Sequence, residues 1–347
     1  MKALILEQNA QLRYKEIAEP AEEKGMYLIK VIAAGICGSD IHRGFENGAY
    51  HYPLVMGHEF SGRIVAVPAG GKYKKGSLVT VFPLLPCKTC NPCSTGDYAQ
   101  CANYDYYGSR RDGGFAEYVS VPEENLFAVP EGVDPFHAAM TEPCAVALHG
   151  VRKLRMSGGE TAAVYGSGPI GNMVAQWLRI LGCAKVAVID IDEAKLELAS
   201  KMGFIPVNAR VSDPVKAIAD LTNGNGAMKV VEACGIPVTM RQAVLSAARF
   251  GEVVLLGNAS GDLVLKPSDL SSILRKEIII HGTWNSKVTP RGGDDWTTVL
   301  EYMRKGLDLA PLISHTPRLS EGAEIFDIVV GKREPVNKVI FKIAEAY

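Results

Sequence analysis

Four cysteines of this 347-residue chain fall within fifteen residues, at Cys87, Cys90, Cys93 and Cys101. Their spacing, C-x2-C-x2-C-x7-C, lets a tight turn direct successive thiolates at one ion, and a returning loop supplies the fourth. A metal held by four thiolates has no open coordination position, so such a site stabilises the fold and takes no part in a reaction. Zinc is the expected metal, and an iron–sulfur cluster is the alternative.

A second pair of metal-binding side chains is Cys37, in the segment Gly-Ile-Cys-Gly-Ser-Asp-Ile-His, and His58, in Gly-His-Glu. A soft thiolate and an imidazole together suit zinc, and a catalytic zinc needs a third protein ligand and one open position. The pair alone is weak evidence, because most cysteines and histidines of a chain are unrelated. The dispersed Cys144, Cys183 and Cys234 are expected to be small buried side chains.

A glycine-rich turn follows the apolar run 162–165 and opens a helical pattern. Gly166 permits a tight turn, Gly168 lets the backbone approach a pyrophosphate, and Gly171 lets helix and strand pack closely. The helix that begins at Pro169 and Ile170 offers free N–H groups and a positive dipole end to phosphates. This context indicates a dinucleotide site, with a purely structural turn as the alternative.

Asp190 lies nineteen residues after Gly171, at the end of the next apolar run. A carboxylate at this place accepts hydrogen bonds from the adenosine ribose hydroxyls and repels a 2′-phosphate. Ile191 and Asp192 follow it, with no adjacent arginine that would favour that phosphate. The sequence therefore predicts NAD rather than NADP.

The elements that position these groups differ along the chain. From about residue 161, short apolar runs alternate with helical patterns, which predicts a parallel sheet covered on both faces. The first 140 residues are rich in glycine, proline and short β-branched runs, which is typical of an irregular β domain. After residue 284 we expect helices over 298–305 and 322–330 and a closing strand over 339–343. The predicted class is α/β, with a doubly wound parallel domain inserted into a β-rich one.

Charge and hydropathy exclude several classes of protein. The chain has 37 basic and 38 acidic side chains, so it lacks the basic excess of proteins that bind nucleic acids or anionic membranes. No apolar run approaches the roughly 20 residues that cross a bilayer, and the N-terminus does not resemble a signal peptide. We therefore expect a cytoplasmic protein without nucleic-acid or membrane partners.

Taken together, these motifs resemble the zinc-dependent medium-chain dehydrogenase/reductase family, in its polyol branch. The segments D-G-G-F-A-E-Y at 112–118 and T-E-P at 141–143 add to the likeness, which covers essentially the whole chain. The resemblance implies a GroES-like catalytic domain over 1–146 with a zinc lobe at about 84–104. It further implies a Rossmann NAD domain over 147–284 and a return to the catalytic domain over 285–347.

The same resemblance implies two zinc ions per chain, one structural and one catalytic. The catalytic ligands would be Cys37, His58 and Glu142 of the T-E-P segment. Cys144 is close in sequence but does not align with the third ligand. In members of this family a glutamate such as Glu59 can approach the metal as water leaves.

Three further residues of the first segment receive roles from the resemblance. Asp40 is similar to the carboxylate that holds a ligand histidine and fixes its tautomer. Ser39 would contact the substrate oxygen, and His42 would pass its proton towards solvent.

The implied reaction is NAD-dependent oxidation of a secondary hydroxyl of a polyol, and we expect a hexitol phosphate. Guanidinium groups grip phosphate with two parallel hydrogen bonds. The candidate substrate contacts are Arg43, Arg110, Tyr50 and His51, with Arg111 and Lys287 as further cations. Solvated or structurally paired arginines are the alternative reading.

Three alternatives to this function stay open. An unphosphorylated polyol, as in sorbitol dehydrogenases, or threonine could be the substrate of the same machinery. A zinc-stabilised, NAD-binding regulatory protein is the non-enzymatic alternative, although it would not need an open metal site. The family also implies a homodimer or homotetramer, joined through the edge around 278–284.

Overall fold

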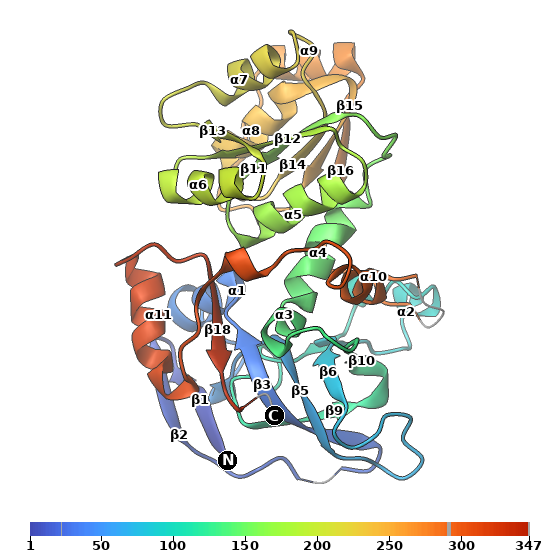
Figure 1. Ribbon diagram of the computed structural model, residues 1–347, viewed down its shortest axis with the longest axis vertical. Coiled ribbons are helices and arrows are strands. Elements are labelled where there is room, and N and C mark those ends of the chain that lie inside the picture. The colour runs from blue at the N-terminus through green and yellow to red at the C-terminus, as the bar shows by residue number, and fades with distance from the viewer. Residues whose placement is uncertain (22, 290–292, 346–347) are drawn as a thin grey trace. The chain divides into compact units, whose positions relative to one another are not determined.

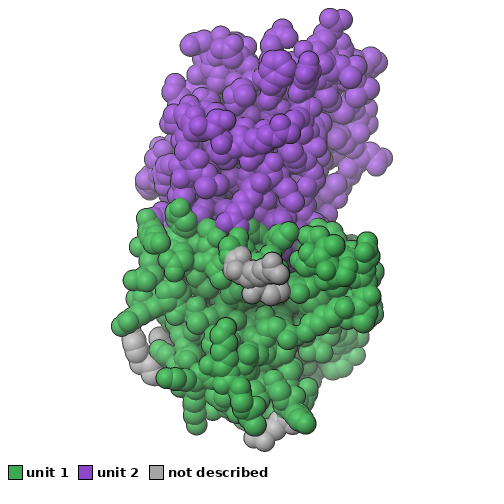
Figure 2. Space-filling view, turned by 90° about the vertical axis from the view of Figure 1, so that its right-hand side faces the viewer, with its two compact units in different colours: residues 1–143, 287–305, 309–347 green, residues 144–286, 306–308 purple. Residues whose placement is uncertain are grey.

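The computed structural model describes residues 1–21, 23–289 and 293–345, and these form two compact units (Figure 2). Unit 1 comprises 1–143, 287–305 and 309–347, and unit 2 comprises 144–286 and 306–308. The chain therefore leaves unit 1 after residue 143 and re-enters it at 287, where the sequence led us to expect 146 and 285. No helix in these described ranges is both long and apolar enough to span a bilayer.

Unit 2 is built on a six-stranded parallel sheet of order β13-β12-β11-β14-β15-β16. Its strands are β11 (Thr161–Tyr165), β12 (Lys185–Asp190), β13 (Ile205–Asn208), β14 (Ala227–Glu232), β15 (Ala247–Leu255) and β16 (Ile279–Gly282). The helices are α5 (Pro169–Ile180), α6 (Glu193–Lys201), α7 (Pro214–Leu221), α8 (Pro237–Ser246) and α9 (Pro267–Lys276). Helices α5 and α6 cover one face of the sheet, and α7 to α9 cover the other (Figure 1). The predicted doubly wound domain is confirmed.

Local sequence explains how these helices begin. The side chain of Asp192 accepts hydrogen bonds from the first free N–H groups of α6, and Asp213 does the same for α7. Each such cap stabilises a helix by about 1 kcal/mol. Helix α5 begins instead with Gly168 as its N-cap and Pro169 in its first turn, and no side chain of the described residues caps it. Its free N–H groups are thus left for a ligand.

Unit 1 contains a seven-stranded mixed sheet, a three-stranded sheet of order β2-β1-β4 and the small pair β7-β8. The larger sheet has the order β10-β6-β5-β3-β18-β17, and β9 also pairs with β3. Its strands are β3 (Met26–Gly35), β5 (Glu59–Ala66), β6 (Leu78–Val81), β9 (Tyr118–Pro122), β10 (Leu126–Ala128), β17 (Ile313–His315) and β18 (Lys338–Lys342). The smaller sheets use β1 (Lys2–Gln8), β2 (Gln11–Glu16), β4 (Leu54–Val55), β7 (Leu84–Leu85) and β8 (Asp105–Tyr106).

The helices of unit 1 are short except at its later segments. They are α1 (Gly38–Ile41), α2 (Asn91–Ser94), α3 (Pro135–Ala139), α10 (Asp295–Tyr302) and α11 (Gly322–Gly331), and α4 (Thr141–Val151) runs on into unit 2. Strand β18 pairs antiparallel with β3, with Ile340 opposite Gly35, so the C-terminal segment lies in the same sheet as the first Gly-Ile-Cys segment. Helix α11 lies beside β1 and β2 (Figure 1), and its Phe326 joins Phe115 and Phe341 in the core.

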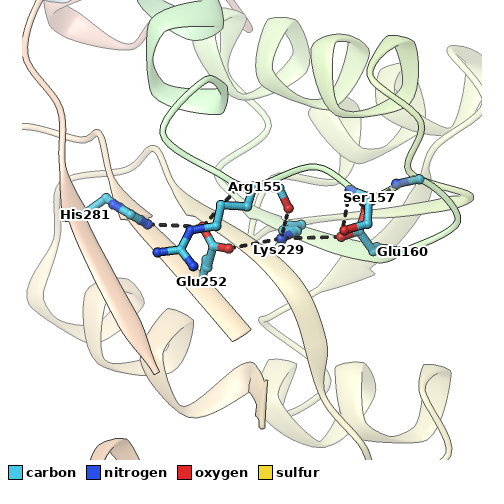
Figure 3. Close-up of polar contacts among 7 residues, drawn as sticks. Arg155, Ser157, Glu160, Lys229, Glu252 and His281 are labelled. Carbon is cyan, nitrogen blue, oxygen red and sulfur yellow. Dashed lines mark hydrogen bonds and ion pairs between the residues drawn. The ribbon is translucent and has the colours of Figure 1, made fainter. Parts of the chain in front are cut away.

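A buried charged network ties the segment after α4 to the sheet of unit 2 (Figure 3). Lys229 of β14 is 3% exposed, and its Nζ lies 3.3 Å from Glu252 of β15 and 3.4 Å from Glu160. The same ammonium donates to the carbonyl of Arg155, whose own N–H donates to Glu252 over 3.1 Å. His281 of β16 contacts the same Glu252 carboxylate at 3.2 Å. The Lys229 ammonium and the Glu252 carboxylate therefore connect β14, β15, β16 and the segment after α4.

Candidate functional site

Pairing of β3 with β5 brings Cys37 close to His58 and Glu59. Gly35, the last residue of β3, lies opposite Glu59 in the ladder, and Cys37 follows as the N-cap of α1. The ligand atoms of Cys37, His58 and Glu59 all lie within 4.8 Å of one another. A Cβ at Gly35 would come to 2.3 Å from Oε2 of Glu59, so the approach of the carboxylate requires glycine there.

Asp40 lies beside this cluster and contacts both Cys37 and His58. Its carboxylate is fully buried and accepts hydrogen bonds from the N–H of Cys37 at 3.0 Å and from Nη1 of Arg43 at 2.9 Å. One oxygen also lies 3.4 Å from Nδ1 of His58. Burial by itself would raise the pKa of Asp40, but His58 and the Arg43 guanidinium outweigh it and hold that pKa below its ordinary value. Asp40 and His58 are thus neighbours, but among the described residues Nδ1 of His58 has no hydrogen-bond partner.

Glu142 lies in the first turn of α4 and is 6% exposed. Tyr106 donates a hydrogen bond to its Oε1 at 3.3 Å. Burial raises the pKa of Glu142 to about 7, the charge of Glu59 adds to that rise, and His58 opposes it. Glu142 therefore belongs to the same electrostatic environment, although the compact three-residue group contains Glu59 in its place.

Lys338 is a member of this site that sequence reasoning missed. It is 3% exposed, pairs with Glu59, and donates to the carbonyl of Ile36 over 2.8 Å. Because it starts β18, more than 300 residues from Ile36, no local pattern links the two. A charged residue at the start of an apolar closing strand is the one signal that the sequence offers.

Ser39 and His42 lie in the turn that follows Cys37. Ser39 is in α1, and His42 begins a π-helix (His42–Glu46), a rare form that is frequent at functional sites. The His42 ring is exposed and pairs with Glu46. This exposure suits a group that exchanges protons with solvent.

The candidate substrate residues have different surroundings. Arg43 is engaged by Asp40 and its side chain is only 15% exposed. The Arg110 guanidinium carbon lies 4.0 Å from the ring centroid of Tyr104 and 4.9 Å from that of Tyr50, and its Nη1 donates to the carbonyl of Tyr104. Both ring nitrogens of His51 face carbonyl oxygens, those of Pro53 at 3.1 Å and of Arg110 at 3.2 Å. Two other cations are paired with acids, Arg111 with Asp105 and Lys287 with Asp97.

The four clustered cysteines converge on one point. The Sγ atoms of Cys90 and Cys93 are 3.4 Å apart, those of Cys90 and Cys101 3.8 Å, and those of Cys87 and Cys93 4.0 Å. Disulfide sulfurs would lie only about 2.05 Å apart. Four thiolates bound tetrahedrally at about 2.3 Å from zinc would lie about 3.8 Å apart. These residues fit a closed zinc site.

In unit 2 the glycine turn and Asp190 have the geometry that a dinucleotide needs. Gly166 has a φ of 103°, in the region that favours glycine, and a Cβ at Gly171 would come to 1.8 Å from the Gly166 carbonyl oxygen. A Cβ at Gly168 would meet nothing within 4 Å, so the backbone there is open to a ligand. Asp190 accepts from the N–H of Ser167 at 2.7 Å, which fixes its carboxylate beside the turn.

Family models match both parts of the chain. Residues 23–131 match the alcohol dehydrogenase GroES-like domain, and residues 169–305 match the zinc-binding dehydrogenase domain. The chain is 36% identical to galactitol 1-phosphate 5-dehydrogenase of Escherichia coli K12, over 91% of its own length and 92% of the relative. The chain belongs to the zinc-dependent medium-chain dehydrogenase/reductase family. It is thus an alcohol oxidoreductase, as the sequence predicts.

Other members of the family are also similar. L-threonine 3-dehydrogenase of Bacillus velezensis is 33% identical over 98% of both chains. The crystal structure of galactitol-1-phosphate dehydrogenase from E. coli superposes with a TM-score of 0.91 at 34% identity, covering 99% of this chain and 100% of that one. A zinc-binding dehydrogenase from Sinorhizobium meliloti, bound to NADP, gives 0.89 at 30% identity and covers 98% of both chains. Zinc and a nicotinamide dinucleotide are therefore the cofactors of this dehydrogenase.

Proposed function

We propose that this dehydrogenase oxidises a secondary hydroxyl of a phosphorylated polyol to a ketone, with NAD as the acceptor. Similarity to galactitol 1-phosphate 5-dehydrogenase supports a hexitol phosphate such as galactitol 1-phosphate, whose oxidation gives a ketose phosphate of the tagatose 6-phosphate type. The structural observation that supports the phosphate is Arg110, whose guanidinium lies over the rings of Tyr50 and Tyr104. Nη1 of this guanidinium donates to the carbonyl oxygen of Tyr104, and its remaining N–H groups would grip a phosphate.

The residues proposed to hold the catalytic zinc are Cys37, His58 and Glu142. Their sulfur, nitrogen and oxygen donors fit zinc, and a three-ligand set leaves a fourth position for substrate. Bound zinc would act as a Lewis acid that lowers the pKa of the substrate hydroxyl. Asp40 orients the His58 ring, and Lys338 balances the charge of Glu59, which lies beside the same metal position.

Proton removal is proposed to run along the turn after Cys37. Ser39 would accept the hydroxyl proton of the substrate and pass its own proton on towards His42, whose exposed ring would release it to solvent. The Glu46 carboxylate pairs with the exposed His42 ring, so an acceptor for the released proton lies beside that ring. Bound NAD would supply the hydride acceptor, and that chemistry belongs to the cofactor.

The preference for NAD is proposed from Asp190. Its two oxygens accept from the N–H groups of Ser167, Ile191 and Asp192, so its negative charge is fixed at the end of β12. A 2′-phosphate at this place would face that charge at close range. The expected preference thus differs from the cofactor seen in the S. meliloti structure.

A homodimer or homotetramer is proposed through the free edge of the unit 2 sheet. Strand β16 is the last in the order and exposes Ile280, and Trp284 follows it with 57% of its surface accessible. Helix α9 exposes Leu270 and Leu274. An open strand edge with apolar neighbours is a common pairing surface.

We keep the cytoplasm as the expected location.

Turnover with a matched substrate panel tests this proposal. Reduction of NAD and of NADP should be followed with galactitol 1-phosphate, sorbitol 6-phosphate, galactitol, sorbitol and L-threonine. We expect turnover with a polyol phosphate and NAD, lost after zinc removal by a chelator and restored by added zinc. Turnover confined to free polyols or threonine would contradict the proposal that the substrate is phosphorylated. No turnover with any of these substrates would contradict the assignment of a polyol substrate.

A further inference from the structure

Tyr106 contacts both Glu142 and His58, two proposed ligands from different parts of the chain. It is the second residue of β8, whose pairing with β7 lies beside the cysteine lobe, residues 84–104. Its hydroxyl donates to Oε1 of Glu142 at 3.3 Å. Its ring lies edge-on to the His58 imidazole, with centroids 5.7 Å apart and planes inclined by 62°.

The two contacts restrict two different motions. The terminal torsion of a glutamate is broad, so a free carboxylate turns readily, and a hydrogen bond to one oxygen fixes its plane. The edge contact limits tilting of the His58 ring on one side, while Asp40 lies 3.4 Å from Nδ1 of that ring. Tyr106 thus acts on the orientation of both proposed ligands at once.

The groups that contact the carboxylates of Glu59 and Glu142 differ in charge. Glu59 is paired with the ammonium of Lys338, so its negative charge is balanced within the protein. Tyr106 is a neutral donor, which satisfies one oxygen of the buried Glu142 without balancing its charge. The hydrogen bond from Tyr106 therefore orients the carboxylate of Glu142 without pairing it with a cation, whereas the carboxylate of Glu59 is already paired with one.

We propose that Tyr106 is a positioning residue of the metal centre, which fixes the carboxylate plane of Glu142 and the ring of His58 so that both face one zinc ion. This inference rests on the zinc site proposed above. Residues that orient metal ligands through a hydrogen bond typically contribute about 10- to 100-fold to metal affinity. Nothing in the local sequence around Tyr106 marks it for this role.

The test compares two tyrosines of one segment. Tyr106→Phe removes the hydroxyl and keeps the ring, whereas Tyr104→Phe is the matched control, because the ring of Tyr104 stacks on Arg110. Zinc affinity is measured by competition with a chromophoric chelator. The visible absorption of the Co²⁺-substituted protein, minus that of the Cys37→Ser variant, reports ligand geometry at the proposed catalytic site.

We expect Tyr106→Phe to bind zinc about 10- to 100-fold more weakly at this site, with shifted Co²⁺ bands, and Tyr104→Phe to match the wild type in both. Tyr106→Leu, which also removes the ring contact with His58, should lose more. Wild-type zinc affinity and Co²⁺ bands in Tyr106→Phe would overturn the positioning role.

Glu142→Gln separates this failure from failure of the zinc site itself. If Glu142→Gln weakens zinc binding and Tyr106→Phe does not, only the role of Tyr106 is overturned. If Glu142→Gln leaves zinc affinity unchanged, Glu142 is not a ligand, and both the ligand assignment and the role of Tyr106 are overturned.

Discussion

Lys338 and Glu59 form an ion pair whose side chains are only 4% and 1% exposed. Strand β18 carries the lysine and β5 the glutamate, so the pair joins the C-terminal segment to the proposed metal site through β3. Removing one member of a buried pair leaves an unbalanced charge away from water. The C-terminal segment thus contributes a charge to the site as well as a strand to the sheet.

Lys338→Met should therefore destabilise unit 1 by about 3–5 kcal/mol, because Glu59 loses its counter-charge. The double variant Lys338→Met with Glu59→Gln should recover much of this loss, and urea unfolding of the zinc-free protein measures both. Lys342→Met is the control, since its partner Glu345 is exposed and such pairs contribute about 0–1 kcal/mol. Equal stability of Lys338→Met and Lys342→Met would refute the buried-pair account.

Arg110→Met should raise KM for a polyol phosphate by about 10- to 100-fold, because a hydrogen bond to a charged group contributes about 1.5–3 kcal/mol. KM for the corresponding free polyol should change little. Arg111→Met is the matched neighbour, because Arg111 is paired with Asp105. A similar rise in KM for phosphorylated and free polyols would show that Arg110 supports the fold rather than binding phosphate.

Sequence alone could predict the features whose geometry is local. The glycine turn and the four cysteines each lie within fifteen residues, and type and spacing determine what such segments can bind. Tertiary pairing determines the rest. Lys338 reaches Ile36 across 302 positions, and Tyr106 reaches Glu142 across 36. No periodicity links such residues, so only the assembled sheet could reveal them.

Arg43 shows a different limit of what the sequence could predict about the site. Its bond to Asp40 is an i,i+3 contact in a helical turn, which spacing could have suggested. The sequence also allows Arg43 to be a phosphate contact, because an arginine beside a catalytic segment has both uses. The structure shows where its guanidinium lies, and Arg110 remains the better candidate for phosphate.

Lowering the pH should weaken the contribution of the buried network around Lys229 and Glu252 to the free energy of unfolding. Burial would raise the pKa of Glu252, but the N–H of Arg155 and the ammonium of Lys229 outweigh it and lower that pKa below its ordinary value. A lowered pKa in the folded state means that Glu252 stabilises the protein above its ordinary pKa and that this contribution disappears as pH falls through the lowered one. The difference in unfolding free energy between wild type and Glu252→Gln should therefore shrink as the pH falls below about 4.3.

Urea titrations of both proteins from pH 6 to 3 measure that difference. Glu277→Gln, on a residue outside the network shown in Figure 3, serves as the control and should show no such decline. A difference that grows with acidity would have the wrong sign for a lowered pKa.

Asp190→Gly should allow NADP to be used, because the fixed negative charge beside the ribose is removed. The ratio of kcat/KM for NAD to that for NADP should fall by at least tenfold, with zinc content unchanged. Steady-state kinetics with both cofactors measure this ratio. If the wild type already prefers NADP, the assignment made from Asp190 is wrong.

Metal content measured together with turnover tests the central claim most directly. We predict two zinc ions per chain in the wild type, and one in Cys37→Ser, which should keep its fold and lose NAD reduction with polyol phosphates. Cys93→Ser should lose the other zinc ion, because it belongs to the closed cysteine site. Full turnover by Cys37→Ser, or two zinc ions retained in that variant, would contradict the account.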